Sequence, residues 1–309
     1  MRIEERDLLQ RCSICTDSRV LVQLAQEELA IAGVESPRFE AQLLVSLAYG
    51  VSRVAVIAGV VDLTDLVSTT RFVEMLKRRV GRTPLAYIRG NQEFYGLTFA
   101  VTPETLIPRP ETELLVDFAR EVLNTSAAGD RPILVDVGTG TGCIAISALW
   151  HLPDARAIAV DLSRGALNVA RQNADSLCVQ DRIRFLQGSL LNPIHARVPL
   201  VVTNPPYIPS AEIYELQPEV RLSEPHAALD GGADGLDLIR EIVDQAPNVL
   251  MNSGWLAIEG GMGQAPDIET ILTRGGFDSV TTTRDLSGIG RVVSGRLRTE
   301  RYLLSGDPG

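Results

Sequence analysis

The chain has 309 residues, of which 45% are hydrophobic, and a formal net charge of −10 at neutral pH. This size and composition are typical of a globular enzyme, and no stretch is apolar over the roughly 20 residues that a membrane-spanning helix needs. The acidic balance disfavours stable binding to nucleic acid, because proteins that contact phosphates usually present a basic face.

The cysteines and histidines predict neither a disulfide framework nor a metal site. The four cysteines include a single C-x-x-C pair, Cys12 and Cys15, with no second pair or histidine near it. The three histidines are dispersed along the chain, and the charged residues 1–7 differ from a secretory signal peptide. We therefore expect a cytoplasmic protein with no metal and no membrane partner.

Residues 1–85 are predicted to form a small helical domain. Apolar residues repeat at helical spacing in three segments, about 18–33, 36–50 and 64–81. Thr64 can cap the third segment. Because short amphipathic helices bury their apolar stripes only against one another or a partner, we expect a bundle that docks a substrate. The basic run that contains Arg79 is explained by a solvated helix end at least as well as by an RNA contact.

Residues 86–105 change in character and are predicted to form a hairpin linker. The run from Phe94 to Val101 is rich in aromatic and β-branched residues and has a glycine near its start. A proline on each side of Arg109 then stiffens the entry to a helix whose first turn is acidic. For Arg109 and Glu111 the simplest interpretation is a local salt bridge.

From residue 131 onward, predicted strands alternate with helices, which is typical of a mostly parallel, doubly wound α/β sheet. The predicted strands lie near residues 133–137, 156–160, 183–186, 199–203, 254–259, 279–284 and 291–297. Ligands of such sheets bind at the carboxyl ends of the strands, so we expect the functional site at that edge. Residues 303–309 are expected to be a tail.

A glycine-rich loop follows the first predicted strand. It consists of Gly138, Thr139, Gly140, Thr141 and Gly142. Glycines at such a position let the chain turn sharply and let a ligand approach the backbone. The G-x-G-x-G spacing departs from the G-x-G-x-x-G of dinucleotide-binding proteins, which favours S-adenosylmethionine over NAD as the bound cofactor.

Asp161 stands at the end of the second predicted strand, where a carboxylate can accept hydrogen bonds from both ribose hydroxyls of a nucleoside. The structural alternative is a helix N-cap, for which Ser163 is better placed. The third strand is followed by Ser189 and Leu190. We expect adenine there, with Leu190 covering its face.

The fourth predicted strand ends in the motif of Asn204, Pro205, Pro206 and Tyr207. Proline lacks an N–H and holds the preceding residue extended, so the motif is predicted to be a stiff arch. The Asn204 side-chain oxygen and the Pro205 carbonyl can accept both N–H bonds of a planar –NH2 group, while Tyr207 covers its flat face. A rigid Pro-Pro turn with a capping Asn is the structural alternative.

Together these motifs resemble class I S-adenosylmethionine-dependent methyltransferases that act on an amide or exocyclic nitrogen. The flanking segments resemble the HemK/PrmC family, the glutamine methyltransferases of peptide chain release factors. These segments are residues 84–90, 94–96, 107–113, 224–229 and 231–235. The resemblance covers nearly the whole chain and is most specific from about residue 84 to 300.

The resemblance implies a Rossmann-like, seven-stranded methyltransferase domain at residues 106–302, with the last strand antiparallel. It implies that S-adenosylmethionine is the cofactor. It also implies that the substrate is the glutamine of the Gly-Gly-Gln motif in class I release factors, methylated on N5. The family often has an acid and an aromatic residue after the third strand, where this chain has Ser189 and Leu190.

The hypothesis for the reaction is an in-line displacement in which the amide nitrogen attacks the sulfonium methyl group. Its N–H bonds to Asn204 and the Pro205 carbonyl strengthen as the nitrogen gains positive character, while Tyr207 fixes the attack angle. The same arch suits an exocyclic amino group, so the alternative is an N-methyltransferase acting on a nucleobase in RNA or DNA. A catalytically idle cofactor-binding adaptor is a second alternative, which the intact motif disfavours.

Overall fold

The computed structural model describes residues 9, 12, 15, 17–124 and 131–299. The predicted tail, 303–309, lies outside these residues. The chain divides into two compact units, one of residues 1–90 with 217–223 and the other of residues 91–216 with 224–309.

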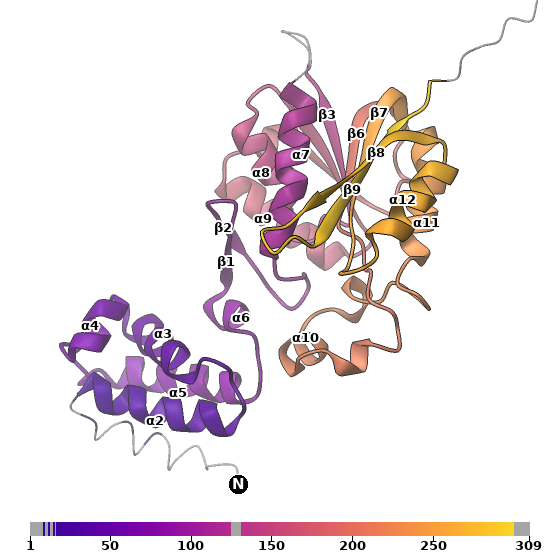
Figure 1. Ribbon diagram of the computed structural model, residues 1–309. Coiled ribbons are helices and arrows are strands. Elements are labelled where there is room, and N and C mark those ends of the chain that lie inside the picture. The colour runs from indigo at the N-terminus through magenta and orange to yellow at the C-terminus, as the bar shows by residue number, and fades with distance from the viewer. Residues whose placement is uncertain (1–8, 10–11, 13–14, 16, 125–130, 300–309) are drawn as a thin grey trace, which may run out of the picture. The chain divides into compact units, whose positions relative to one another are not determined.

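The first unit is helical, as the apolar spacing predicts (Figure 1). Its helices are α2 (Ser18–Ile31), α3 (Pro37–Tyr49), α4 (Arg53–Ala58), α5 (Leu66–Val80), α6 (Leu85–Arg89) and α10 (Pro218–Ser223). The apolar stripes of α2, α3 and α5 face one another and bury Leu21, Leu44 and Phe72 completely. The prediction of Thr64 as a cap is wrong by one position, because the Asp65 carboxylate accepts the first N–H bonds of α5.

The end of α5 is not simply solvated. Arg79 has only 6% of its side chain exposed and pairs with Glu40 of α3 at 2.5 Å and with Glu219 of α10 at 2.9 Å. Arg82 also pairs with Glu219, at 2.6 Å. The interpretation of the Arg79 run as a solvated helix end is therefore wrong for this residue, which joins three helices of the first unit.

The second unit begins with a hairpin that is shorter than the predicted range of 86–105, because residues 85–89 form α6 of the first unit. Its antiparallel strands are β1 (Asn91–Phe94) and β2 (Leu97–Ala100). The two residues between the strands, Tyr95 and Gly96, both have positive φ, as a tight two-residue hairpin turn requires. After the hairpin, a short 3₁₀ turn, η1 (Pro110–Thr112), leads into α7 (Glu113–Asn124).

The second unit is built on a seven-stranded sheet in the order β5-β4-β3-β6-β7-β9-β8. The strands are β3 (Ile133–Val137), β4 (Arg156–Asp161), β5 (Ile183–Gln187), β6 (Val198–Thr203), β7 (Leu250–Glu259), β8 (Phe277–Arg284) and β9 (Gly290–Leu297). The first five are parallel, and β9 is antiparallel to both β7 and β8. This confirms the predicted doubly wound sheet and its antiparallel last strand.

Helices cover both faces of this sheet (Figure 1). They are α7, α8 (Cys143–His151), α9 (Arg164–Ser176), α11 (Asp237–Gln245) and α12 (Ala265–Arg274). Successive residues of β3 point into two separate cores, with Leu134 packed among residues of α7 and α8 and Val135 among residues of α11 and α12. A strand buried on both faces reads as a continuous apolar run, which is why the sequence reveals it.

The order of the strands in the sheet indicates where a ligand can bind. After β3 the chain builds β4 and β5 on one side, then crosses to form β6 on the other side. The order therefore reverses at β3 and β6, where Val137 lies opposite Thr203. Ligands of open α/β sheets bind beside such a switch point, at the carboxyl ends of the strands.

Candidate functional site

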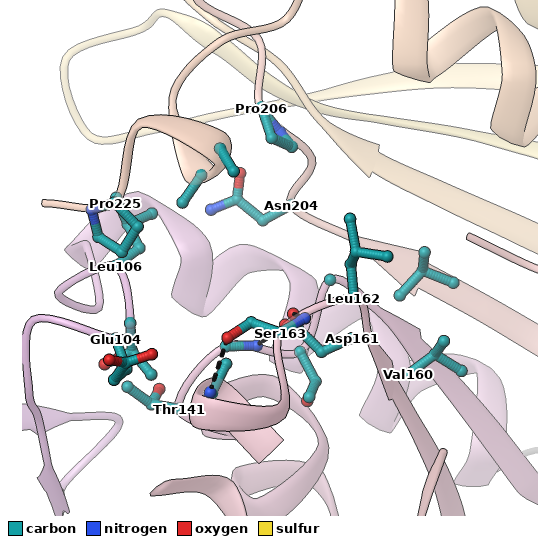
Figure 2. Close-up of a pocket in the computed structure, with 18 of the residues that line it drawn as sticks. Glu104, Leu106, Thr141, Val160, Asp161, Leu162, Ser163, Asn204, Pro206 and Pro225 are labelled. Atoms are coloured by element: carbon teal, nitrogen blue, oxygen red, sulfur yellow. Dashed lines mark hydrogen bonds between the residues drawn. The ribbon is translucent and has the colours of Figure 1, made fainter. Parts of the chain in front are cut away.

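A pocket of about 440 Å³ opens at this edge of the sheet. It is lined by the ends of β3, β4 and β6, by the turn after β5, and by segments near residues 103–112 and 225–228. Figure 2 shows Asp161 and Asn204 at the same pocket, although they follow different strands. The predicted site residues that line it are Gly138, Thr139, Gly140, Thr141, Asp161, Leu190, Asn204 and Pro206.

The glycine loop leaves its backbone open to the pocket. Gly138 and Gly140 have φ values of 69° and 54°, and a Cβ atom on either would meet nothing closer than 3.9 Å. Gly142 has a different role, since a Cβ there would lie 2.6 Å from Ile146 of α8. Gly142 is not one of the described residues that line the pocket. The first two glycines keep the ligand side clear, and the third allows the loop to pack on the helix.

Asp136, the fourth residue of β3, stabilises this loop. It was not among the functional residues predicted from the sequence. Its buried carboxylate accepts hydrogen bonds from the Thr139 hydroxyl at 2.6 Å and from the Ala145 N–H at 3.2 Å. Burial raises its pKa to about 6. An aspartate inside an apolar strand was the available signal, because buried acids are rare without a partner.

Asp161 accepts a hydrogen bond from the Gly140 N–H at 2.9 Å and another from the Ser163 N–H at 2.8 Å. Ser163 caps α9 by accepting from the Ala166 N–H, so the cap is Ser163 as predicted. A carboxylate has about four lone-pair sites, so Asp161 can also accept a hydrogen bond from a hydroxyl donor in the pocket. Burial raises its pKa.

Apolar side chains line the pocket beside this carboxylate. Leu190 adopts a φ of 50°, in the left-handed region that non-glycine residues rarely occupy. Leu162, which the sequence analysis did not single out, is 68% exposed and also lines the pocket. An exposed leucine on a ligand-sized pocket is available to cover a flat apolar group.

The arch after β6 presents Asn204 and Pro206 to the pocket, while Pro205 is buried. The Asn204 Nδ2 donates to the Thr112 hydroxyl at 3.1 Å. Tyr207 does not appear among the described lining residues, and its backbone carbonyl accepts from the Gln264 side chain at 2.9 Å. Burial, reinforced by nearby Glu259, raises the pKa of the Tyr207 phenol to about 12, so the ring is neutral.

Arg109 does not form the local salt bridge with Glu111 that the sequence analysis favoured. Its guanidinium pairs with Glu224 at 2.5 Å, and the Ile107 N–H donates to the same carboxylate at 3.3 Å. Glu111 instead lies 4.0 Å from Arg291. The buried Glu224 carboxylate attracts Arg109 more strongly than the solvated Glu111 does, because charges interact more strongly in a low dielectric.

These residues fit a nucleoside cofactor. The glycine loop leaves room for a ligand against its backbone. The Asp161 carboxylate can accept hydrogen bonds from ligand hydroxyls, and Leu162 and Leu190 can cover a flat apolar group in the same pocket. The described residues contain no group of three or more His, Cys, Asp or Glu arranged to hold a metal ion. In that same part of the chain, no helix is long and apolar enough to cross a membrane.

Two family models match the chain. The Methyltransferase small domain matches residues 112–217, and the PrmC N-terminal domain matches residues 21–90. Among solved structures, the hMettl16 catalytic domain in complex with MAT2A 3′UTR hairpin 6 has a TM-score of 0.54 at 16% identity. That match covers 75% of this chain and 82% of the other. At that identity it shows a shared fold only.

Curated relatives are similar over nearly their whole length. The release factor glutamine methyltransferase of Geobacter sulfurreducens is 43% identical over 87% of this chain and 93% of its own. The protein of that name from Bradyrhizobium diazoefficiens is 40% identical, covering 87% and 91%. The one from Vibrio cholerae is 36% identical, covering 91% and 96%.

Proposed function

Because this chain belongs to the family of release factor glutamine methyltransferases, we propose that it methylates a release-factor glutamine on the side-chain amide nitrogen. The methyl donor is S-adenosylmethionine. The observation that carries the proposal is the position of Asn204, which lines the pocket that also contains the glycine loop and Asp161. Under this proposal, the acceptor for the amide N–H and the site for the nucleoside share one cavity.

The residues that would hold the cofactor are the glycine loop, Asp161 and Leu190, with Asn204 at the reacting end. Gly138 and Gly140 leave room for the ligand against the backbone, and Asp161 offers acceptors for the ribose hydroxyls. When bound, S-adenosylmethionine supplies a methyl group made electrophilic by its sulfonium.

The arch would act on the substrate by position and by electrostatics. Since the Asn204 Nδ2 is committed to Thr112, its Oδ1 is the atom available to accept an N–H bond from the glutamine amide. The Pro205 carbonyl would accept the second N–H, and Tyr207 would pack on the amide plane. Both bonds strengthen as the nitrogen gains positive character, and stabilisation that grows towards the transition state raises the rate.

The finer substrate assignment follows from the family resemblance. It identifies the substrate as the glutamine of the Gly-Gly-Gln motif in class I release factors. Since release factors act in translation, we also propose that the reaction takes place in the cytoplasm. The net charge of −10 supports a protein substrate over stable nucleic-acid binding.

Mass spectrometry of a release factor incubated with the enzyme and S-adenosylmethionine tests the proposal. We expect one added methyl group on the glutamine. A release factor with Gln→Glu at that position is the control substrate, since glutamate brings no N–H donors, and sites of this kind discriminate by ~10⁴. With a methyl-labelled cofactor, label in RNA or DNA and none in the release factor would overturn the proposal in favour of the nucleobase alternative.

A further inference from the structure

Three residues from separate elements meet at the arch, and two of them, Asn204 and Thr112, line the pocket. Asn204 follows β6, Thr112 ends η1, and Glu259 is the last residue of β7, next to β6 in the sheet. The Asn204 Nδ2 donates to the Thr112 hydroxyl at 3.1 Å, and the same hydroxyl interacts with the Glu259 carboxyl, where it lowers the pKa of the acid. Thr112 is 2% exposed and Glu259 is 1% exposed, so water does not compete for either bond.

The chemistry of the hydroxyl gives this chain of bonds a direction. A threonine hydroxyl carries one proton, and an ionised carboxylate can only accept. If Thr112 gives its proton to Glu259, its oxygen is free to accept from Asn204, and only the amide nitrogen of Asn204 can donate. The Asn204 oxygen is then left for the substrate. In the opposite direction, Asn204 would offer –NH2 to the N–H bonds of the substrate amide.

The carboxyl of Glu259 is unusual for its position. Its Oε2 has no hydrogen-bond partner among the described residues, and a buried acid without full pairing is costly. A side chain that only filled space at the end of β7 would be cheaper if it were neutral. The free-energy cost of burying the Glu259 carboxyl is understandable if its negative charge has a function at the neighbouring arch.

We propose that Glu259 is a positioning residue that acts through Thr112 to hold the Asn204 side chain with its oxygen towards the substrate amide. This rests on the proposed function, because the orientation matters only for a substrate that donates N–H bonds. Glu259 itself touches neither the substrate amide nor the cofactor in this arrangement. Its contribution therefore belongs to the rate of methyl transfer rather than to cofactor affinity.

The ionisation of Glu259 should make kcat depend on pH. A purely structural role for Glu259 would not produce this dependence. Burial raises its pKa to about 7, so the carboxyl titrates near neutral pH. In the part of the chain that the structure describes, the other titratable or charged groups that interact with it are Glu111, Arg109, Arg291, Tyr207 and Cys143. Once protonated, the carboxyl can donate to Thr112 and reverse the chain of bonds. We expect kcat of the wild-type enzyme to fall as the pH drops below about 7.

Two substitutions test the proposal in the full-length enzyme with a release factor as substrate. In Glu259→Gln the carboxamide can donate as well as accept, so the direction is no longer imposed. In Thr112→Val the hydroxyl is absent. For both variants we expect kcat to fall at least about tenfold, little change in the Kd for S-adenosylmethionine, and loss of the wild-type decline below pH 7. Thr112→Ser restores the hydroxyl and should recover most of the rate.

Glu269→Gln is the matched control, because Glu269 accepts from the Thr282 hydroxyl at 2.5 Å and has no link to Asn204. If Glu259→Gln does not fold, as judged by circular dichroism, the Thr112→Val and Thr112→Ser pair decides. Wild-type kcat and an unchanged pH profile in Thr112→Val would overturn the inference and leave the proposed function standing. A wild-type enzyme that does not methylate a release factor would instead remove the proposed function.

Discussion

Arg109 and Glu224 lie 115 positions apart in the sequence and form an ion pair with an N–O distance of 2.5 Å beside the pocket. The Glu224 side chain is 1% exposed, while that of Arg109 is 34% exposed and lines the cavity. Because Glu224 also accepts the Ile107 N–H, the pair joins the segment before η1 to the segment that follows α10. Two separate walls of the pocket are held together by one carboxylate.

Replacement of Arg109 by alanine should destabilise the protein, because it leaves the buried Glu224 carboxylate without its cation. We expect a loss of about 2 kcal/mol in the free energy of unfolding, the cost typical of a buried polar group deprived of a partner. Urea denaturation measures it. Arg240→Ala is the control, since that residue pairs with exposed Asp234, and such pairs contribute roughly 0–1 kcal/mol. Equal losses in the two variants would contradict the prediction.

Much of this fold could be predicted because its strands are buried on both faces. Apolar runs such as residues 133–137, each followed by glycine, aspartate or asparagine, mark strands that end at a polar edge. Since the carboxyl ends of parallel strands meet at one edge, the same pattern predicts that Asp161 and Asn204 share a pocket. The antiparallel direction of β9 came from the family resemblance, since apolar periodicity does not encode strand direction.

The interactions that the sequence analysis missed join residues far apart in the chain. Thr112 and Glu259 are single polar residues in ordinary surroundings, and only the fold brings them to Asn204. Arg79 lies in a basic run that resembles a solvated helix end, and its burial depends on Glu219 of a segment far along the chain. Spacing along the sequence carries no information about such pairs.

Replacement of Asp161 by asparagine should weaken cofactor binding. The neutral amide offers fewer acceptor sites than the carboxylate, and hydrogen bonds to a charged group contribute ~1.5–3 kcal/mol. We therefore expect the Kd for S-adenosylmethionine, measured by calorimetry, to rise about tenfold or more. The matched control is Asp181→Asn, at an exposed position in a 3₁₀ turn away from the pocket lining. Unchanged affinity in Asp161→Asn would remove this carboxylate from the cofactor site.

Replacement of Asn204 by alanine should separate binding from chemistry. The variant loses the acceptor for the substrate amide but keeps the glycine loop and Asp161, so cofactor affinity should change little. We expect kcat for release-factor methylation to fall by ~10² or more, the usual cost when a reacting group is misplaced by about 1 Å. Single-turnover kinetics with labelled cofactor measure the rate directly. Turnover close to that of the wild type would rule out this role for Asn204.

Replacement of Arg79 by methionine should destabilise the helical unit. Methionine keeps much of the volume but leaves Glu40 without its cation and Glu219 with Arg82 alone. Breaking a buried pair from one side costs ~3–5 kcal/mol, so we expect a clear fall in the urea midpoint and faster proteolysis within residues 217–223. Arg71→Met is the control, at an exposed position of the same helix. Equal effects from the two substitutions would mean that the buried ion cluster contributes no more than an exposed charge on α5.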